Sequence, residues 1–261
     1  MKNFFFDTAN INFIKDAWLK LEKHVDKQNV MGITTNPNAF YKIGKLKLNE
    51  WFEDTKKLCE LVSEIRGDDY GVVYIQCPIS NMNPNEVLEY AKTVSKLSDG
   101  KTKIGLKIPP HTDILKINKE LQKYVETNVT GLADCSTALK CVTYGVDYIS
   151  IIPGRMEEVG INAKEQIDFI NQSNLNNTII IAGSMRTIEQ LKWTFQYGTV
   201  PTIGEKVWDL IFSDNNLDEL INLNYTKSET YSQFTPCISS KNLELSIGFF
   251  EQMDGIGKNA I

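Results

Sequence analysis

Histidine is scarce in this sequence, and its scarcity excludes several kinds of chemistry. Only His24 and His111 are present, and neither belongs to a cluster of potential metal ligands. Zinc sites need three or four such ligands, and serine–histidine catalysis needs a histidine beside its nucleophile. We therefore expect no metal ion, and because no nucleotide motif is present either, we expect no cofactor.

Other absences narrow the class of protein. A net charge of -5 without a basic stripe argues against a nucleic-acid-binding protein. No apolar run approaches the length of a membrane-spanning helix, and the N-terminal residues are too poor in apolar content for a signal peptide. The five cysteines are an odd number without C-x-x-C spacing. This pattern predicts reduced thiols in a cytoplasmic protein that does not bind membranes.

The chain is long enough for one large core. It has 261 residues, of which 42% are hydrophobic and 23% are charged. No internal repeat, low-complexity tract or linker divides it. We expect a single domain over residues 1–212, followed by a C-terminal extension over residues 213–261.

Short apolar runs alternate with amphipathic segments along the whole domain. The runs have the length of strands, and the segments between them repeat their apolar residues every three or four positions, as helices do. The eight expected strands span residues 4–7, 30–34, 70–76, 103–109, 127–132, 146–152, 178–183 and 200–203. The expected helices span residues 11–25, 51–65, 84–97, 114–124, 138–144, 163–171, 186–197 and 205–212.

This alternation predicts an α/β fold with a parallel sheet covered by helices. Eight strand–helix units in a chain of this length fit a closed (β/α)8 TIM barrel. An open, doubly wound sheet is the alternative, but no glycine-rich dinucleotide turn follows the first strand.

The strand at residues 103–109 carries an unusual charge. Ile104, Leu106 and Ile108 alternate with Gly105 and Lys107, and two prolines end the strand just after the lysine. A lysine in such a strand is costly to bury, because desolvation disfavours the ammonium. The same effect makes the amine a nucleophile for ketones through a Schiff base. The alternative is a lysine whose side chain reaches solvent from the strand end.

A TIM barrel places its chemistry at the C-terminal ends of its strands. The polar residues expected there are Asp7, Thr34, Asn36, Gln76, Lys107, Thr130, Ser150, Arg155, Ser184 and Arg186. Each alone could cap a helix, fill a strand or lie in solvent. Together, one lysine, one carboxylate, several hydroxyls and amides, and two arginines converge on one rim, which is typical of an enzyme.

Several segments resemble the transaldolase family, and most closely its short-chain branch, which includes bacterial fructose-6-phosphate aldolase. They are FFFDTANINFIKDA, GITTNPN, IGLKIP, TNVTGLADCSTALKCVTYGVDYISIIPGRMEEVGINA and IIIAGSMRT, in that order. The resemblance implies that Lys107 is the Schiff-base lysine and Asp7 the acid/base. It implies that Thr130, with Gln76, holds the catalytic water. The remaining substrate contacts that it implies are made by Thr34, Asn36, Ser150, Arg155, Ser184 and Arg186.

This resemblance predicts transfer of a dihydroxyacetone unit from a ketose phosphate to an aldose phosphate, in the pentose phosphate pathway of carbohydrate metabolism. The alternative is a lyase that releases free dihydroxyacetone, and a third possibility is a barrel that binds sugar phosphates without catalysis. Gln76 matches the aldolases, since transaldolases typically carry Glu there. Ile152 stands where aldolases have Tyr and transaldolases Phe, and its apolar wall favours transfer.

Further departures from the family concern the pocket wall and the C-terminal segment. Asn38, Ala133 and Thr137 replace the family's usual residues, which predicts an altered substrate range or a reduced rate. Residues 243–250 carry an apolar surface that the barrel does not need. Together with the resemblance, this surface predicts a homo-oligomer, a pentamer or decamer, with its contacts in the extension. Residues 213–241 look like an insertion.

Overall fold

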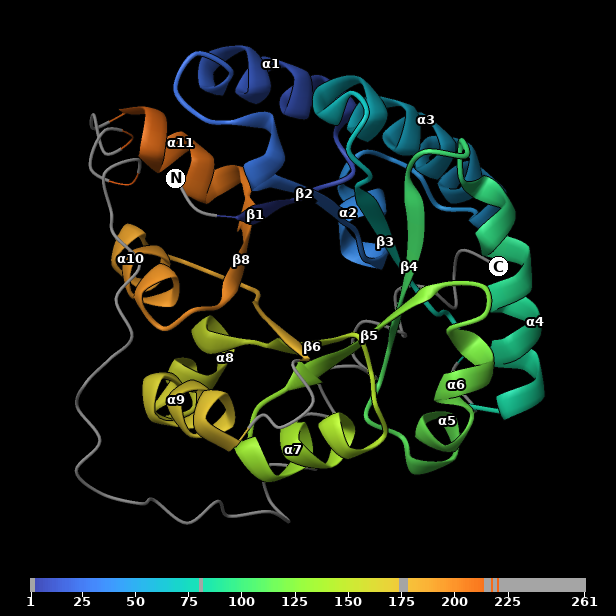
Figure 1. The fold of residues 1–261 in the computed structure, drawn as a ribbon. Coiled ribbons are helices and arrows are strands. Elements are labelled where there is room, and N and C mark those ends of the chain that lie inside the picture. Colours follow the sequence, from blue (N-terminus) through green and yellow to red (C-terminus); the bar gives the residue numbers. More distant parts are fainter. Residues whose placement is uncertain (1–2, 80–81, 174–177, 214–216, 218–219, 221–261) are drawn as a thin grey trace.

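Eight parallel strands close into a barrel that is surrounded by helices (Figure 1). The computed structural model describes residues 3–79, 82–173, 178–213, 217 and 220. The strands are β1 (Phe4–Asp7), β2 (Val30–Thr34), β3 (Val72–Gln76), β4 (Lys103–Ile108), β5 (Glu126–Leu132), β6 (Tyr148–Ile151), β7 (Ile179–Ala182) and β8 (Val200–Gly204). Each strand pairs with its neighbours in sequence, and β8 pairs with β1. The expected closed (β/α)8 barrel is therefore confirmed, and the alternative of an open, doubly wound sheet is excluded.

Helices follow the strands and cover the outside of the barrel. They are α1 (Ile11–Leu21), α2 (Pro37–Lys42), α3 (Leu48–Arg66), α4 (Pro84–Val94), α5 (Thr112–Lys116), α6 (Asn118–Leu121), α7 (Cys135–Thr143), α8 (Pro153–Glu158), α9 (Ala163–Ser173), α10 (Ile188–Gln196) and α11 (Glu205–Ser213). Two short 3-10 turns, η1 (Lys27–Asn29) and η2 (Ser95–Leu97), complete the described elements. Most of the expected extension, residues 213–261, lies outside the described residues.

The helices differ from the prediction in two places. The single helix expected over residues 114–124 is two short pieces, α5 and α6. The Asn118 side chain at the break is buried and donates hydrogen bonds to the carbonyl oxygens of Tyr144 and Gly145, at 3.1 and 3.0 Å. The short helices α2 and α8 were not predicted. Each begins with a proline, whose fixed φ and missing N–H suit the first helical position.

Alternation along each strand decides which side chains enter the barrel. In β1, Phe4 and Phe6 point outward and pack against Trp208 of α11, with ring centroids 5.4 Å away in both cases. Phe5 points inward, so Asp7, two residues later, points inward as well. The same rule places Lys107 inside the barrel, two residues after Gly105.

An aromatic cluster closes the barrel interior below the polar residues. Phe5, Tyr74 and Tyr148 are its main members, and Val72 and Ile181 complete it. The Tyr74 ring lies 5.7 Å from Phe5 and 5.5 Å from Tyr148, edge to face in both cases. We call these five residues the aromatic floor. Because the aromatic floor fills the barrel at this level, the polar residues toward the C-terminal strand ends lie directly above tightly packed side chains.

Two further findings concern membranes and thiols. None of the described helices is both long and apolar enough to cross a membrane. Cys59, Cys77 and Cys141 are buried and form no disulfide bond, as expected. Cys135 is instead disulfide-bonded, so the expectation of reduced thiols is wrong for this residue. An odd number of cysteines requires one unpaired thiol but does not exclude a bridge.

The aromatic floor depends on the absence of a side chain at Gly105. A Cβ atom there would lie 2.2 Å from two atoms of the Tyr74 ring, which is held by Phe5 and Tyr148. We predict that Gly105→Ala lowers the free energy of unfolding by about 1–3 kcal/mol, the usual cost of overpacking a core. Urea denaturation measures this change.

Gly204→Ala is the matched control, because the nearest atom to its added Cβ is 3.7 Å away. Equal stability losses in the two variants would contradict the steric explanation.

Candidate active site

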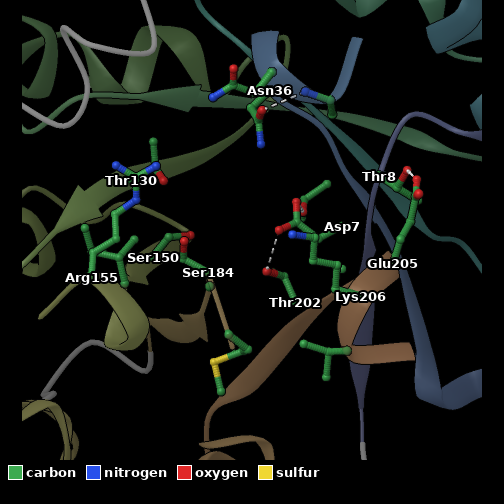
Figure 2. A pocket seen from close by; sticks show the side chains of 18 of the residues that line it. Asp7, Thr8, Asn36, Thr130, Ser150, Arg155, Ser184, Thr202, Glu205 and Lys206 are labelled. Carbon is green, nitrogen blue, oxygen red and sulfur yellow. Dashed lines mark hydrogen bonds between the residues drawn. The ribbon is translucent and has the colours of Figure 1, made fainter. Parts of the chain in front are cut away.

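A cavity of about 670 Å³ opens at the C-terminal ends of the strands (Figure 2). Nine of the ten residues predicted for the site line it. They are Asp7, Thr34, Asn36, Lys107, Thr130, Ser150, Arg155, Ser184 and Arg186. The tenth, Gln76, does not line the cavity. These residues come from β1, β2, β4, β5 and β6, from the loops after β2 and β7, and from α8, and they share one space, as a TIM-barrel enzyme requires.

Lys107 is buried in this cavity, with 8% of its surface exposed. Its Nζ donates a hydrogen bond of 3.3 Å to the carbonyl oxygen of Thr35. Desolvation lowers the pKa of the ammonium below its ordinary value, and the nearby Asp7 carboxylate partly offsets this effect. The lysine thus releases its proton more readily than an exposed lysine would.

Two hydroxyl groups hold the Asp7 carboxylate. Thr34 Oγ1 donates to Asp7 Oδ1 at 2.9 Å, and Thr202 Oγ1 donates to Asp7 Oδ2 at 3.3 Å (Figure 2 shows the second bond). The two threonines come from the strands on either side of β1. Thr34 was predicted as a substrate contact, whereas here it orients the carboxylate. Thr202 was not predicted, although Thr202 and Phe5 are paired in register and therefore face the same way.

Asn36 lies at the start of α2 and caps it. Its Oδ1 accepts a hydrogen bond of 3.0 Å from the Ala39 backbone N–H. This bond fixes the orientation of the amide, and Figure 2 shows the Asn36 side chain at the cavity wall. The capping role and a substrate-binding role are therefore compatible, because the amide nitrogen is not used in the cap.

Ser150 and Thr130 lie on neighbouring strands, β6 and β5. Ser150 Oγ donates a hydrogen bond of 2.7 Å to Asn128 Oδ1. Asn128 was not predicted. It is fully buried and paired in register with Lys107, and its Nδ2 has no hydrogen-bond partner among the described residues. A pairing of Asn128 with the lysine could have been found only from the register of β4 and β5.

Gln76 is paired in register with Lys107 but does not line the cavity. It is 1% exposed, and neither its amide oxygen nor its amide nitrogen has a hydrogen-bond partner within the part of the chain that the structure describes. Thr130 lines the cavity and Gln76 does not, so the two residues predicted to hold a water are not both at its surface.

Arg155 and Arg186 form a positively charged end of the cavity with Ser184. Burial lowers the pKa of the Arg155 guanidinium, and the like charge of Arg186 lowers it further, whereas Glu158 raises it. Ser184 has a φ of +60°, in the left-handed region that is uncommon for residues other than glycine. A Cβ atom on Gly154 would lie 2.3 Å from the Ser184 carbonyl oxygen, so the start of α8, which carries Arg155, is in close contact with the loop after β7, which carries Arg186.

The opposite wall contains residues that the sequence did not single out. Thr8, Lys42, Glu205 and Lys206 line it, and Thr8 Oγ1 donates a hydrogen bond to Glu205 Oε1. These residues lie at or beyond the ends of β1, β2 and β8. The sequence pattern singles out the first polar residue after each strand, so it does not reveal residues farther along the chain.

The departures from the family pattern fall into two groups. Ile152 and Asn38 line the cavity, so they alter its surface directly. Ala133 and Thr137 are buried but do not line it. Among the described residues, no three His, Cys, Asp or Glu side chains are grouped to hold a metal ion.

The Transaldolase/Fructose-6-phosphate aldolase family matches residues 4–244 of this chain. The chain belongs to this family. A probable transaldolase of Caldicellulosiruptor saccharolyticus is 30% identical over 206 residues, which cover 76% of this chain and 84% of the relative. A probable transaldolase of Thermoplasma volcanium is 28% identical over 220 residues, covering 82% of this chain and 90% of the relative. The expected family is therefore confirmed.

Solved structures outside the transaldolase family share the barrel. The tryptophan synthase A-subunit from Pyrococcus furiosus aligns with a TM-score of 0.52 at 11% identity, covering 95% of this chain and 97% of that one. A mutant of (S)-mandelate dehydrogenase aligns with a TM-score of 0.51 at 10% identity, covering 100% of this chain and 78% of that one. At these identities only the fold is shared.

The burial of Lys107 predicts a stability cost. Below the folded-state pKa of this lysine the buried ammonium is present and its desolvation penalty applies in full. As the pH rises through that pKa the folded protein loses the charge, and its stability increases up to the ordinary lysine pKa. We therefore predict that Lys107→Met is more stable than the natural chain at pH 7 by about 1 kcal/mol or more.

Urea denaturation between pH 6 and pH 10 measures this difference, which we expect to shrink as the pH rises. A Lys107→Met chain that is less stable at every pH would show that the ammonium is stabilising in this cavity.

Proposed function

We propose that this chain is a transaldolase that works through a Schiff base on Lys107. The neutral amine attacks the C2 carbonyl of a ketose phosphate, and loss of water gives an iminium ion. The iminium accepts the electron pair of the C3–C4 bond when that bond breaks. Asp7 takes the proton of the C4 hydroxyl, so an aldose phosphate leaves and an enamine stays on Lys107.

The second half of the reaction reverses these steps on a different aldehyde. The enamine carbon attacks the carbonyl of an acceptor aldose phosphate, and Asp7 returns a proton to the new hydroxyl. Water, held by Thr130, then hydrolyses the new iminium and frees the product ketose. No step requires a metal ion or a redox cofactor.

The observation that carries this proposal is the pairing of Lys107 and Asp7 in one cavity. The amine is buried and its pKa is lowered, and the carboxylate is held in place by Thr34 and Thr202. An amine nucleophile and an oriented base are the two groups that the reaction needs. A barrel that only binds sugar phosphates needs neither.

The remaining cavity residues suit a phosphorylated sugar. Arg155 and Arg186 offer planar guanidinium groups that bind phosphate oxygens in pairs. Asn36 and Ser150 offer an amide and a hydroxyl for sugar hydroxyls. Binding energy from the distant phosphate orients the reacting carbons over Lys107. Fructose 6-phosphate and sedoheptulose 7-phosphate are the proposed donors.

A lyase that releases free dihydroxyacetone is the second candidate. It requires the intermediate on Lys107 to be hydrolysed before an acceptor arrives. Ile152 lines the cavity with an apolar side chain that offers no hydrogen bond to water. This wall favours transfer over release. Gln76, which is typical of the aldolases, is the feature that favours release.

The Schiff base can be tested by trapping. We predict that incubation with fructose 6-phosphate and borohydride adds a dihydroxyacetone-sized mass to the natural chain, because reduction fixes the iminium. Intact mass spectrometry measures the adduct, and Lys107→Ala should show none. An adduct of equal yield in the variant would place the Schiff base on another lysine. No adduct in either protein would overturn the proposed mechanism for this sugar.

Ile152 allows a test of transfer against release. We predict that Ile152→Tyr raises the release of free dihydroxyacetone relative to transfer to erythrose 4-phosphate, because a phenol can hold a water beside the intermediate. Ile152→Phe is the matched control, since it adds the ring without the hydroxyl. The ratio of free dihydroxyacetone to transfer product decides the outcome. Equal ratios in the two variants would mean that water is positioned elsewhere.

The setting of this activity stays a prediction. The cytoplasmic location was predicted from the cysteine pattern, and a role in the pentose phosphate pathway follows from the resemblance to transaldolases. So does a pentameric or decameric assembly, and the segment expected to form its contacts, residues 243–250, lies outside the described residues.

A further inference from the structure

A carboxylate lies at the positively charged end of the cavity. Glu158, the last residue of α8, places its Oε1 3.4 Å from Nε of Arg186. The Arg186 Nη1 group donates to the carbonyl oxygen of Ser184 at 3.1 Å. Arg186 is therefore bound by an anionic group of the protein itself.

Glu158 acts on the second arginine as well. Its charge raises the pKa of the Arg155 guanidinium, against the effects of burial and of Arg186. Its carboxylate is thus close enough to influence both arginines. The Glu158 side chain is 59% exposed and that of Arg186 is 47% exposed. Because both groups reach solvent, the contact is weak and can be exchanged for another anion without unfolding the site.

The backbone that carries these side chains is fixed separately. Gln190 Oε1 accepts a hydrogen bond of 2.6 Å from the Arg186 backbone N–H. Gln190 Nε2 donates one of 2.6 Å to Oε2 of Glu157, the neighbour of Glu158. These two bonds join α8 to the loop after β7. The Arg186 side chain can therefore change its partner while its backbone stays in place.

We propose that Glu158 is a built-in counter-anion of this site, which competes with the phosphate group of the substrate for Arg186 and so sets the affinity for phosphorylated sugars. The identity of the sugar in this inference rests on the proposed function. The binding of an anion by Arg186 does not depend on it. Its chemical basis is that a carboxylate and a phosphate oxygen are alternative partners of one guanidinium. Glu158 also repels a bound phosphate directly, because both carry negative charge.

The test is the substitution Glu158→Gln, which keeps the shape of the side chain and removes its charge. We expect inorganic phosphate to bind about two- to fivefold more tightly, the range that an exposed ion pair allows. Isothermal titration calorimetry at low salt measures this affinity. The KM for fructose 6-phosphate should fall by a similar factor while kcat stays within twofold.

Glu189→Gln is the matched control. Glu189 lies in the first turn of α10, within five positions of Ser184, Arg186 and Gln190 in sequence, and it makes no ion pair among the described residues. The control makes the same change in net charge, so it reports any general effect of charge on phosphate binding. We expect its phosphate affinity to match that of the natural chain.

Two further measurements separate competition from a structural effect. In an Arg186→Ala background, Glu158→Gln should tighten phosphate binding by a smaller factor, because the shared partner is gone and only the direct repulsion remains. In about 1 M salt the gain should vanish, since the screening length falls to about 3 Å. A purely structural effect of the glutamine would survive the added salt.

Each outcome decides the matter. Weaker or unchanged phosphate binding in Glu158→Gln overturns the proposal, as does an equal gain in Glu189→Gln. Absence of phosphate binding in the natural chain overturns it as well. Phosphate binding requires no Schiff base, so a chain that forms no adduct with a ketose phosphate can still give the expected gain. Failure of the proposed function and failure of this inference are therefore distinguishable.

Discussion

The site depends on a single unfavourable burial, that of the Lys107 ammonium within the barrel. An amine that keeps its proton cannot attack a carbonyl, so the proposed reaction needs a lysine whose charged form is disfavoured. β4 provides this by placing the side chain inward, two residues beyond Gly105, where water is scarce. The Thr35 carbonyl oxygen and the Asp7 carboxylate limit the cost. The surrounding barrel supplies the stability that makes such a burial tolerable.

The two ends of the cavity solve different electrostatic problems. Near Lys107, the Asp7 carboxylate is held by two hydroxyl donors, so its position does not depend on the lysine's protonation. At the far end, the like charges of Arg155 and Arg186 influence each other, and the Glu158 carboxylate lies beside Arg186. In the first arrangement Lys107 is buried and Asp7 is half-buried and held by hydrogen bonds, which suits bond breaking. The second is exposed and exchangeable, which suits the capture and release of a charged group.

The sequence reveals much of this arrangement because strand alternation is a strong pattern. Phe5 and Asp7, or Gly105 and Lys107, can be placed inside the barrel from spacing alone. Partners on other strands cannot, because cross-strand register is not written in any one segment. Asn128 and Thr202 were missed for this reason, and Gln76 was expected among the site residues although it does not line the cavity. The break between α5 and α6 was missed because it depends on bonds from Asn118 to a distant turn.

The aromatic floor has a consequence for the order of events. Within the described part of the chain, Phe5, Tyr74 and Tyr148 fill the barrel below the cavity, which opens at the rim that holds the arginines. In the proposed transfer between two sugars, both sugars use this same opening. The first aldose leaves through it before the second arrives, so the proposed covalent intermediate on Lys107 persists between the two events. The lifetime of that intermediate, and hence the balance between transfer and hydrolysis, depends on how well the opening keeps water from the enamine.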